Sequence, residues 1–313
     1  MGHIDNSLVP IPFNLDSLSR LFDEQAARKA EHALIETYGH DSKVPILKLL
    51  DASDPTLREV ANYVYERVYR GYTLKQWGLR PEQLKPGVTG RVPVRISRDD
   101  RYFQDIFQGM PAEGYTAMFN RMLGSSNITV LLGRDWADIQ REVRGERVLY
   151  SGALDELMDF RYGPIPYRSC RFEQRTSPGL RHQAAGTINY PNDYLFTRVT
   201  EQKTLTGQWS EFTTLVTEFP IAHEPGRNTP YYPIPTPANE SLHRRYQSEA
   251  QSTHPNMLFA GRLADYQYYN MDQACASALA LAARCASRKA TTAAGLYARG
   301  SVSTRGTTSV KRG

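Results

Sequence analysis

Side chains that could bind a phosphorylated ligand gather in a few short motifs of this 313-residue chain. Arg95 ends the run Arg91–Arg95 and Arg198 ends Phe196–Arg198, while aromatic residues fill three further motifs, Gly71–Gly78, Pro230–Pro233 and Gly261–Gln273. A guanidinium group can bind two phosphate oxygens at once, and a tyrosine offers a ring face for a base and a hydroxyl for a further oxygen. The pattern therefore predicts a site for a nucleotide diphosphate that carries a small group.

Motifs of several other chemistries are missing from the sequence. The seven histidines occur without His-Glu-x-x-His spacing, and Cys170, Cys275 and Cys285 form no Cys-x-x-Cys pair, so we expect no metal site. The chain also has no Gly-x-Ser-x-Gly elbow and no Walker loop. These absences disfavour metalloenzymes, serine hydrolases and P-loop nucleotidases.

The basic charge of the chain is concentrated at its C-terminal end. Six of the 38 Lys and Arg residues lie from Ser287 onward with no acidic residue, which leaves 32 basic against 33 acidic residues in the body. We therefore expect no nucleic-acid partner, and a disordered basic tail over residues 287–313. The start of the chain shows no basic segment followed by an apolar run, and no stretch reaches membrane-spanning length. A cytoplasmic protein with no membrane span is expected.

Helical periodicity dominates the first third of the chain. The spacing predicts one helix from Leu15 to about Tyr38 and a second from about Ser53 that begins with Pro55 and ends at Gly71. Further helices are expected over Tyr115–Leu123 and from Met271 to Ala286.

Short β-rich runs separated by turn residues follow Gln83. They predict strands over Val92–Ile96, Ile128–Leu132, Arg147–Ser151, Gly186–Tyr190, Phe212–Phe219 and Met257–Ala260. The last of these leads through Gly261 and Arg262 toward the helix at Met271. A strand, a glycine turn and a helix present backbone N–H groups and the positive end of a helix to an anion.

Taken together, the motifs resemble the UDP-galactopyranose mutase family, in its bacterial type. The resemblance runs from about Val9 to about Ala286 and keeps the family's order of seven motifs: Pro12–Asn14, Gly71–Gly78, Arg91–Arg95, Gln108–Pro111, Tyr162–Pro164 with Tyr167–Ser169, Pro230–Pro233, and Gly261–Gln273. Each motif is weak alone, and the ordered set is specific.

The resemblance implies a mixed α/β fold: a partial FAD-binding Rossmann-like domain with an inserted helical bundle and an antiparallel substrate-binding sheet. Residues 1–13, 109–158 and 236–286 would belong to the FAD-binding domain, 14–82 to the bundle, and 83–108 with 159–235 to the sheet domain. The family begins with a βαβ unit whose Gly-rich turn holds the FAD pyrophosphate, and this sequence contains no Gly-x-Gly-x-x-Gly. We therefore expect a truncated relative: a fragment, a chain completed by a neighbouring reading frame, or a decayed member that is inactive alone.

The resemblance also implies the reaction. Family members interconvert UDP-galactopyranose and UDP-galactofuranose for cell-wall galactofuranose, through an adduct between N5 of reduced FAD and the sugar, without net redox change. Arg95 and Arg198 match the arginines that bind the diphosphate and stabilise it as it leaves.

Other positions match substrate or flavin contacts of the family. The implied substrate contacts are Asn14, Tyr72, Thr73, Trp77, Asn189, Tyr232, Tyr268 and Asn270. The implied flavin contacts are Arg168, Arg262, Met271 and Asp272. Phe107 stands where many relatives have a tyrosine, and Asn270 where some have an aspartate, so one phosphate-binding hydroxyl and one charge are missing.

Three hypotheses follow for the function. The first is an active mutase whose flavin-binding unit is supplied elsewhere or missing from the sequence. A homodimer is the oligomer expected for it. The second is a non-catalytic nucleotide-sugar-binding remnant of the family. The third is an unrelated flavin oxidoreductase that shares only the Gly261–Arg262 turn, which would have no need for the remaining motifs. For single residues, the competing interpretations are core packing of the aromatics, surface ion pairs of the arginines, local backbone hydrogen bonds of Asn14 and Asn189, and a plain helix N-terminal acid at Asp272.

Overall fold

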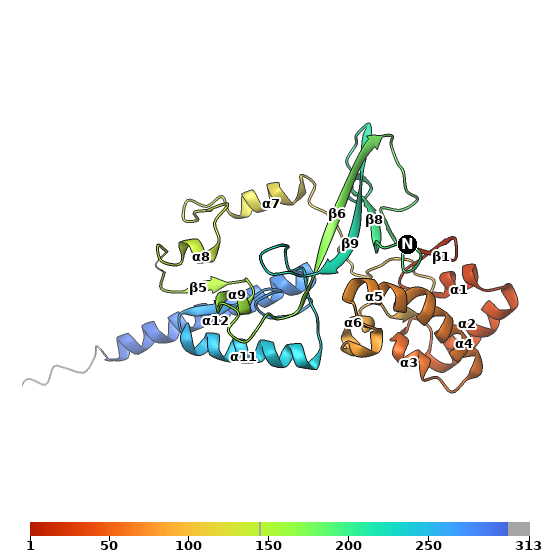
Figure 1. The fold of residues 1–313 in the computed structure, drawn as a ribbon, viewed down its shortest axis with the longest axis horizontal. Coiled ribbons are helices and arrows are strands. Elements are labelled where there is room, and N and C mark those ends of the chain that lie inside the picture. The colour runs from red at the N-terminus through yellow and green to blue at the C-terminus, as the bar shows by residue number, and fades with distance from the viewer. Residues whose placement is uncertain (144, 300–313) are drawn as a thin grey trace, which may run out of the picture.

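A computed structural model describes residues 1–143 and 145–299 of the chain, with side chains described up to Ala286. Three parts follow one another along the long axis of the molecule (Figure 1): a helical part from the N-terminal third, a tall twisted sheet, and a part built around two long C-terminal helices. The mixed α/β class expected from the sequence is confirmed. The division into domains stays a prediction.

The helical part contains α1 (Leu15–Leu21), α2 (Glu24–Tyr38), α3 (Ile46–Leu50), α4 (Pro55–Val64), the π-helix η1 (Tyr65–Arg70), α5 (Gly71–Trp77), the short 3₁₀ turn η2 (Pro81–Gln83) and α6 (Pro86–Gly90). Asn14, Asp23 and Asp54 cap α1, α2 and α4 with their side-chain oxygens, as N-cap residues do. Apolar residues at helical spacing, among them Leu34 and Leu57, are fully buried and form one core.

Two helix boundaries differ from those predicted. The first helix is interrupted, because Asp23 caps a new helix directly after α1 ends. Gly71 does not end the second helix. The chain stays helical through η1 and α5, and the helix ends at Gly78, whose backbone has the left-handed conformation. Gly71 instead allows the helix to lie close to the backbone of Pro191, since a Cβ at position 71 would lie 2.5 Å from the Pro191 carbonyl oxygen.

The sheet has the strand order β10-β6-β9-β8-β7-β1-β2. Its members are β1 (Gly2–Ile4), β2 (Ser7–Val9), β6 (Tyr167–Pro178), β7 (Thr187–Asn189), β8 (Arg198–Glu201), β9 (Phe212–Ala222) and β10 (Tyr232–Pro233). All neighbours are antiparallel except β1 and β7. Helix α10 (Gln202–Thr206) links β8 to β9. The strands predicted at Gly186–Tyr190 and Phe212–Phe219 are confirmed as β7 and β9.

The long strand β6 was not predicted from periodicity. Its burial alternates little: the first residues are mostly buried, and the rest, such as Glu173 and Arg175, are mostly exposed. A polar strand of this kind gives little signal, because pairing with β9 and not burial holds it in place. The strand predicted at Val92–Ile96 is shorter, β4 (Val94–Arg95), and pairs with β3 (Lys43–Val44).

The C-terminal part holds two predicted strands, β5 (Val148–Tyr150) and β11 (Met257–Phe259), which pair in parallel. Helices α9 (Leu154–Leu157) and α11 (Pro237–Thr253) pack there around the fully buried Tyr246. The final helix, α12 (Met271–Arg299), continues past its predicted end at Ala286. The segment expected to be disordered therefore begins as helix, and residues 300–313 lie outside the described part of the chain.

Residues 109–147 carry the exposed helices α7 (Gly114–Met122) and α8 (Trp136–Ile139), neither of which has a buried residue. Helix α7 was predicted, but the strand predicted at Ile128–Leu132 is wrong: its apolar side chains are largely exposed, and no strand forms. An apolar run without a neighbouring strand cannot form the backbone hydrogen bonds that define a sheet. Across the described helices, none combines the length and apolar character that a membrane crossing requires.

Candidate functional site

Three aromatic side chains from distant parts of the chain meet beside α5. Trp77 at the end of α5 lies with its ring centroid 6.0 Å from that of Tyr232 on β10 and 5.2 Å from that of Tyr268, and the two tyrosine rings are 5.4 Å apart. We call these three residues the aromatic cluster. All three contacts are edge-on, the arrangement that aromatic quadrupoles favour.

Arg198 lies at the start of β8, directly opposite Glu218 of β9. Its Nε and Nη2 donate to both carboxylate oxygens of Glu218, at 2.9 and 2.7 Å to Oε2 and 3.0 Å to Oε1. The glutamate side chain is 7% exposed and the arginine 36%. Burial opposes the charge of Arg198, but Tyr72, Glu218 and Tyr232 together raise its pKa. Arg198 is therefore a firmly charged group within reach of Tyr72 and Tyr232.

Burial raises the pKa values of the Tyr72 and Tyr232 phenols, and the charge of Arg198 opposes both shifts. Both hydroxyls stay protonated at neutral pH and can donate hydrogen bonds. On the inner side of Arg198, burial raises the pKa of Cys170 to about 12, with Glu218 adding to the effect. The thiol at this position is not a nucleophile near neutral pH.

Arg91, which the sequence did not single out, joins the aromatic cluster. Its guanidinium carbon lies 4.0 Å from the ring centroid of Tyr268. Nη1 donates to the Tyr268 carbonyl at 2.5 Å, and Nη2 donates to Oδ1 of Asn270. Arg91 thus places a positive charge over the face of the Tyr268 ring, a favourable cation–π contact.

Arg95 is placed differently. Its side chain is buried, and its Nη1 and Nη2 donate to the carbonyls of Arg101 and Tyr102. Both terminal nitrogens of Arg95 hold the backbone of the 101–102 segment, and the side chain is buried, whereas Arg91 is partly exposed. Arg95 therefore supports the chain beside the site in this structure. The phenol of Tyr102 nonetheless interacts electrostatically with Arg91, Arg95 and Arg198 together. The three cations therefore share one region of the molecule.

The signal that separates Arg91 from Arg95 is their place in the local structure. Arg91 precedes β4, in the turn after α6, whereas Arg95 lies within β4 and is 6% exposed. Ligand-binding groups are found more often on such connections than on buried strands. Spacing alone treats the two arginines alike.

The remaining expected substrate residues divide into two groups. Asn189 ends β7 opposite Arg198 in register, Thr73 is buried on α5 beside Tyr72, and Asn270 accepts from Arg91, so these three adjoin the cations. Asn14 lies beside Arg95, whose backbone N–H donates to the Phe13 carbonyl at 2.8 Å; Asn14 caps α1 through Oδ1, and its Nδ2 donates to Asp100 at 2.7 Å. Phe107 is 93% exposed.

Of the expected flavin contacts, Arg168 is used within the protein. Its Nε and Nη2 donate to the carbonyls of Gln76 and Lys75 at 2.8 and 3.0 Å, and so hold the last turn of α5. Arg262 donates to the carbonyls of Tyr231 and Tyr269, and its guanidinium lies 5.5 and 5.3 Å from the rings of Tyr232 and Tyr268.

Met271 and Asp272 begin α12 and are exposed. The positive end of this long helix therefore lies at the surface. A helix N-terminus beside a guanidinium fits the electron-rich edge of a reduced flavin ring. The residues present therefore fit the ring end of FAD.

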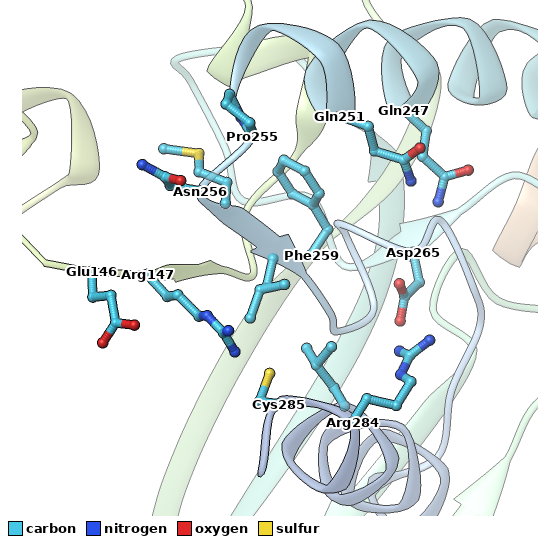
Figure 2. A pocket seen from close by; sticks show the side chains of 13 residues that line it. Glu146, Arg147, Gln247, Gln251, Pro255, Asn256, Phe259, Asp265, Arg284 and Cys285 are labelled. Atoms are coloured by element: carbon cyan, nitrogen blue, oxygen red, sulfur yellow. The ribbon is translucent and has the colours of Figure 1, made fainter. Parts of the chain in front are cut away.

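A cavity beside α12 contains no residue of the aromatic cluster in its lining. The cavity, of about 730 Å³, separates α11 from α12 beside β11, with Gln247 and Gln251 on one wall and Arg284 on the other. In Figure 2, Phe259 points from β11 toward α11, and the side chains of α12 close the opposite wall. The charged and aromatic chemistry lies at Arg198 and the aromatic cluster, and we place the candidate site there on that ground.

Comparison with known proteins identifies the family. The family model described as GLF, UDP-galactopyranose mutase, matches residues 67–268, a span that includes α5, Arg91, Arg198 and the aromatic cluster. The chain belongs to the UDP-galactopyranose mutase family. The resemblance found in the motifs is thereby confirmed.

Individual members of the UDP-galactopyranose mutase family match over most of the chain. A probable UDP-galactopyranose mutase of Klebsiella pneumoniae is 34% identical over 278 residues, 88% of this chain and 71% of the relative. A dTDP-fucopyranose mutase of Escherichia coli is 32% identical over 84% of this chain and 70% of the relative. The UDP-galactopyranose mutase of Mycoplasma pneumoniae is 30% identical over 89% and 74%.

A solved structure shares the fold. The crystal structure of a reduced UDP-galactopyranose mutase superposes with a TM-score of 0.59 at 16% identity, covering 87% of this chain and 75% of that one. At this identity the match supports the fold alone.

Proposed function

We propose that this chain binds UDP-galactopyranose and UDP-galactofuranose and carries the residues for their interconversion. The observation that supports the proposal best is the convergence of Arg198, Arg91 and Tyr72 with the aromatic cluster, from five separate stretches of a chain whose family is established. A diphosphate is bound well by two cations. This region supplies Arg198 and Arg91, together with the hydroxyl donors of its tyrosines.

In this proposal Arg198 and Arg91 bind the diphosphate. Glu218 occupies Nε and Nη2 of Arg198, so Nη1 is the nitrogen left for a phosphate oxygen. Arg91 takes the place that the sequence gave to Arg95, while Arg95 supports the segment carrying Tyr102. When the bond between the sugar and UDP breaks, negative charge accumulates on the diphosphate, and preorganised donors stabilise that charge.

The aromatic residues hold the rest of the nucleotide sugar. The protonated hydroxyls of Tyr72 and Tyr232 donate to phosphate or ribose oxygens, and the Tyr72 ring packs beside the base. Trp77 packs beside the sugar. Asn189 Nδ2 donates to the Met1 carbonyl and Asn270 Oδ1 accepts from Arg91, so Asn189 Oδ1 and Asn270 Nδ2 are the amide atoms we assign to sugar hydroxyls. The uncharged Asn270 keeps a hydrogen bond that an aspartate would make, without its charge.

FAD is the cofactor we propose for the reaction. Arg262 and the start of α12, with Met271 and Asp272, would hold the flavin ring, whereas Arg168 positions α5. In its reduced form the bound flavin supplies a nucleophilic nitrogen for the anomeric carbon. No Gly-x-Gly-x-x-Gly occurs in the 313 residues, so we propose that this polypeptide by itself retains FAD weakly and turns over slowly.

The test is conversion of UDP-galactofuranose with added FAD and dithionite, followed by chromatography. We expect slow conversion by the wild-type chain, loss of most of it in Arg198→Ala, and no change in Arg227→Ala, whose exposed side chain pairs with Glu224 in a turn. Because one relative is named a dTDP-fucopyranose mutase, dTDP-fucopyranose should be tested in parallel. Faster turnover of that sugar would contradict the assignment to galactose.

A non-catalytic nucleotide-sugar-binding protein is the second candidate, favoured by the missing glycine motif. Such a chain would bind UDP through Arg198 yet show no flavin absorbance and no conversion at saturating FAD. Stoichiometric FAD in the purified protein would exclude it.

A further inference from the structure

Lys75 makes contacts that the proposed reaction does not use. Its ammonium group donates to three backbone carbonyls, those of Tyr190 at 2.7 Å, Asn192 at 3.0 Å and Phe196 at 3.3 Å. All three belong to the segment 190–197, which joins β7 to β8. A lysine ammonium has three donors and no acceptor, so this segment satisfies it completely without a carboxylate.

The contact between α5 and this segment is tight at a second place. Gly71 approaches so closely that a Cβ would lie 2.5 Å from the Pro191 carbonyl oxygen and 2.6 Å from Oδ1 of Asn192. The Asn192 amide in turn donates to the Arg67 carbonyl at 2.8 Å, at the preceding turn of the helix. Three successive helical turns therefore hold the same segment.

Each side of this contact carries part of the candidate site. Helix α5 contributes Tyr72 and Trp77, and the segment 190–197 ends directly at Arg198. Arg168 fixes the other side of α5 by binding the carbonyls of Lys75 and Gln76. The position of Tyr72 relative to Arg198 is thus set by what holds α5 against residues 190–197.

We propose that Lys75 is a positioning residue that fixes the separation of Tyr72 and Trp77 from Arg198 and thereby sets the affinity for a nucleoside diphosphate. The proposal rests on the function proposed above. Its chemistry requires a cation with several donors, because three carbonyls converge on one point. Burial lowers the pKa of Lys75 to about 8, with Asp193 opposing the shift. The three carbonyl acceptors offset this cost of burying the ammonium group, and an apolar side chain would leave them without a donor.

A second lysine provides a matched control. Lys203 on α10 also donates to three carbonyls, those of Gly179, Ser210 and Phe212, at 2.8 to 2.9 Å. It lies at the other end of the sheet, where β6 ends and β9 begins. Replacing either lysine with methionine removes three hydrogen bonds from an ammonium group to backbone carbonyls. Only Lys75, however, joins two elements of the candidate site.

The experiment is calorimetric titration of the 313-residue chain with UDP, together with thermal unfolding. We expect Lys75→Met and Lys203→Met to lower the melting temperature similarly, while Lys75→Met alone weakens UDP binding by about tenfold. Lys75→Arg, which keeps the charge and several donors, should recover most of that loss. Unchanged UDP affinity in Lys75→Met, or an equal loss in Lys203→Met, would overturn the proposal.

Amide hydrogen exchange separates this proposal from the proposed function. If the wild-type chain binds no UDP, the proposed function fails, whereas exchange still reports on Lys75. Faster exchange confined to residues 190–198 and α5 in unliganded Lys75→Met supports the positioning role. Exchange equal to wild type there rejects it.

Discussion

Replacement of Gly71 by alanine tests how closely α5 must approach the neighbouring segment. The new Cβ would meet the Pro191 carbonyl oxygen at 2.5 Å, below the 3.0 Å that real contacts keep. The side chain of Asn192 can rotate away, but the Pro191 carbonyl lies between two carbonyls that Lys75 holds. The helix and the segment must therefore separate by roughly half an ångström.

The energetic effect has two opposing parts. Overpacking of this kind costs about 1–3 kcal/mol, whereas alanine in place of a helical glycine gains up to about 1 kcal/mol. Gly87 on α6 is a matched control, because it is helical and its added Cβ meets nothing within 4 Å. The gain in helix propensity is common to both variants, so Gly71→Ala should be less stable than Gly87→Ala by about 1–3 kcal/mol.

Urea unfolding measures that difference, and titration with UDP measures its consequence for the site. We expect Gly71→Ala to bind UDP about tenfold more weakly than wild type, a loss of about 1.4 kcal/mol, and Gly87→Ala to bind normally. If both variants have equal stability and equal UDP affinity, the close contact of α5 does not position the site.

Three further outcomes are expected. Tyr246→Phe should lower the free energy of unfolding by about 1–3 kcal/mol in urea titrations, because the buried hydroxyl donates to one backbone carbonyl and accepts from one N–H; no change would show that these groups find other partners. Cys170, whose pKa is raised to about 12 by burial, should resist alkylation at pH 8 while the exposed Cys275 reacts, as peptide mapping would show; rapid labelling of Cys170 would refute the burial. For Lys75 the folded-state pKa of about 8 lies below the ordinary 10.5, so between these values the unfolded chain binds more protons and stability rises with pH. Wild type should gain unfolding free energy relative to Lys75→Met from pH 8 to 10, and a relative loss would contradict the sign.

The parts of the fold that were predicted from the sequence have strong local signals. Pro55 at the first turn and the apolar stripe of α4 marked a helix that is present, and the short β-rich runs of β5 and β11 marked strands. Strand β6 gave no such signal, since its outer residues are polar and its partner lies about forty residues along the chain. The run Ile128–Leu132 had the right composition but no partner.

The candidate site was predicted in its composition more than in its geometry. The ordered motifs gave the family and the aromatic cluster. Their spacing did not distinguish Arg91 from Arg95, because the two differ in burial and surroundings: Arg91 is partly exposed and stacks on the Tyr268 ring, whereas Arg95 is buried in β4. Arg168 and Asn14 use donors within the protein, and their expected ligand contacts stay predictions. The FAD, the homodimer and the cytoplasmic location expected from the sequence stay predictions.

The most direct test of the two-arginine diphosphate site compares the affinities of UDP and uridine for the wild-type chain and for Arg198→Ala, by calorimetric titration at constant salt. Phosphate binding by Arg198 and Arg91 predicts that wild type prefers UDP over uridine by at least about a hundredfold, or about 2.7 kcal/mol, and that Arg198→Ala loses most of this preference. Equal binding of UDP and uridine by wild type, or an undiminished preference in Arg198→Ala, would contradict it.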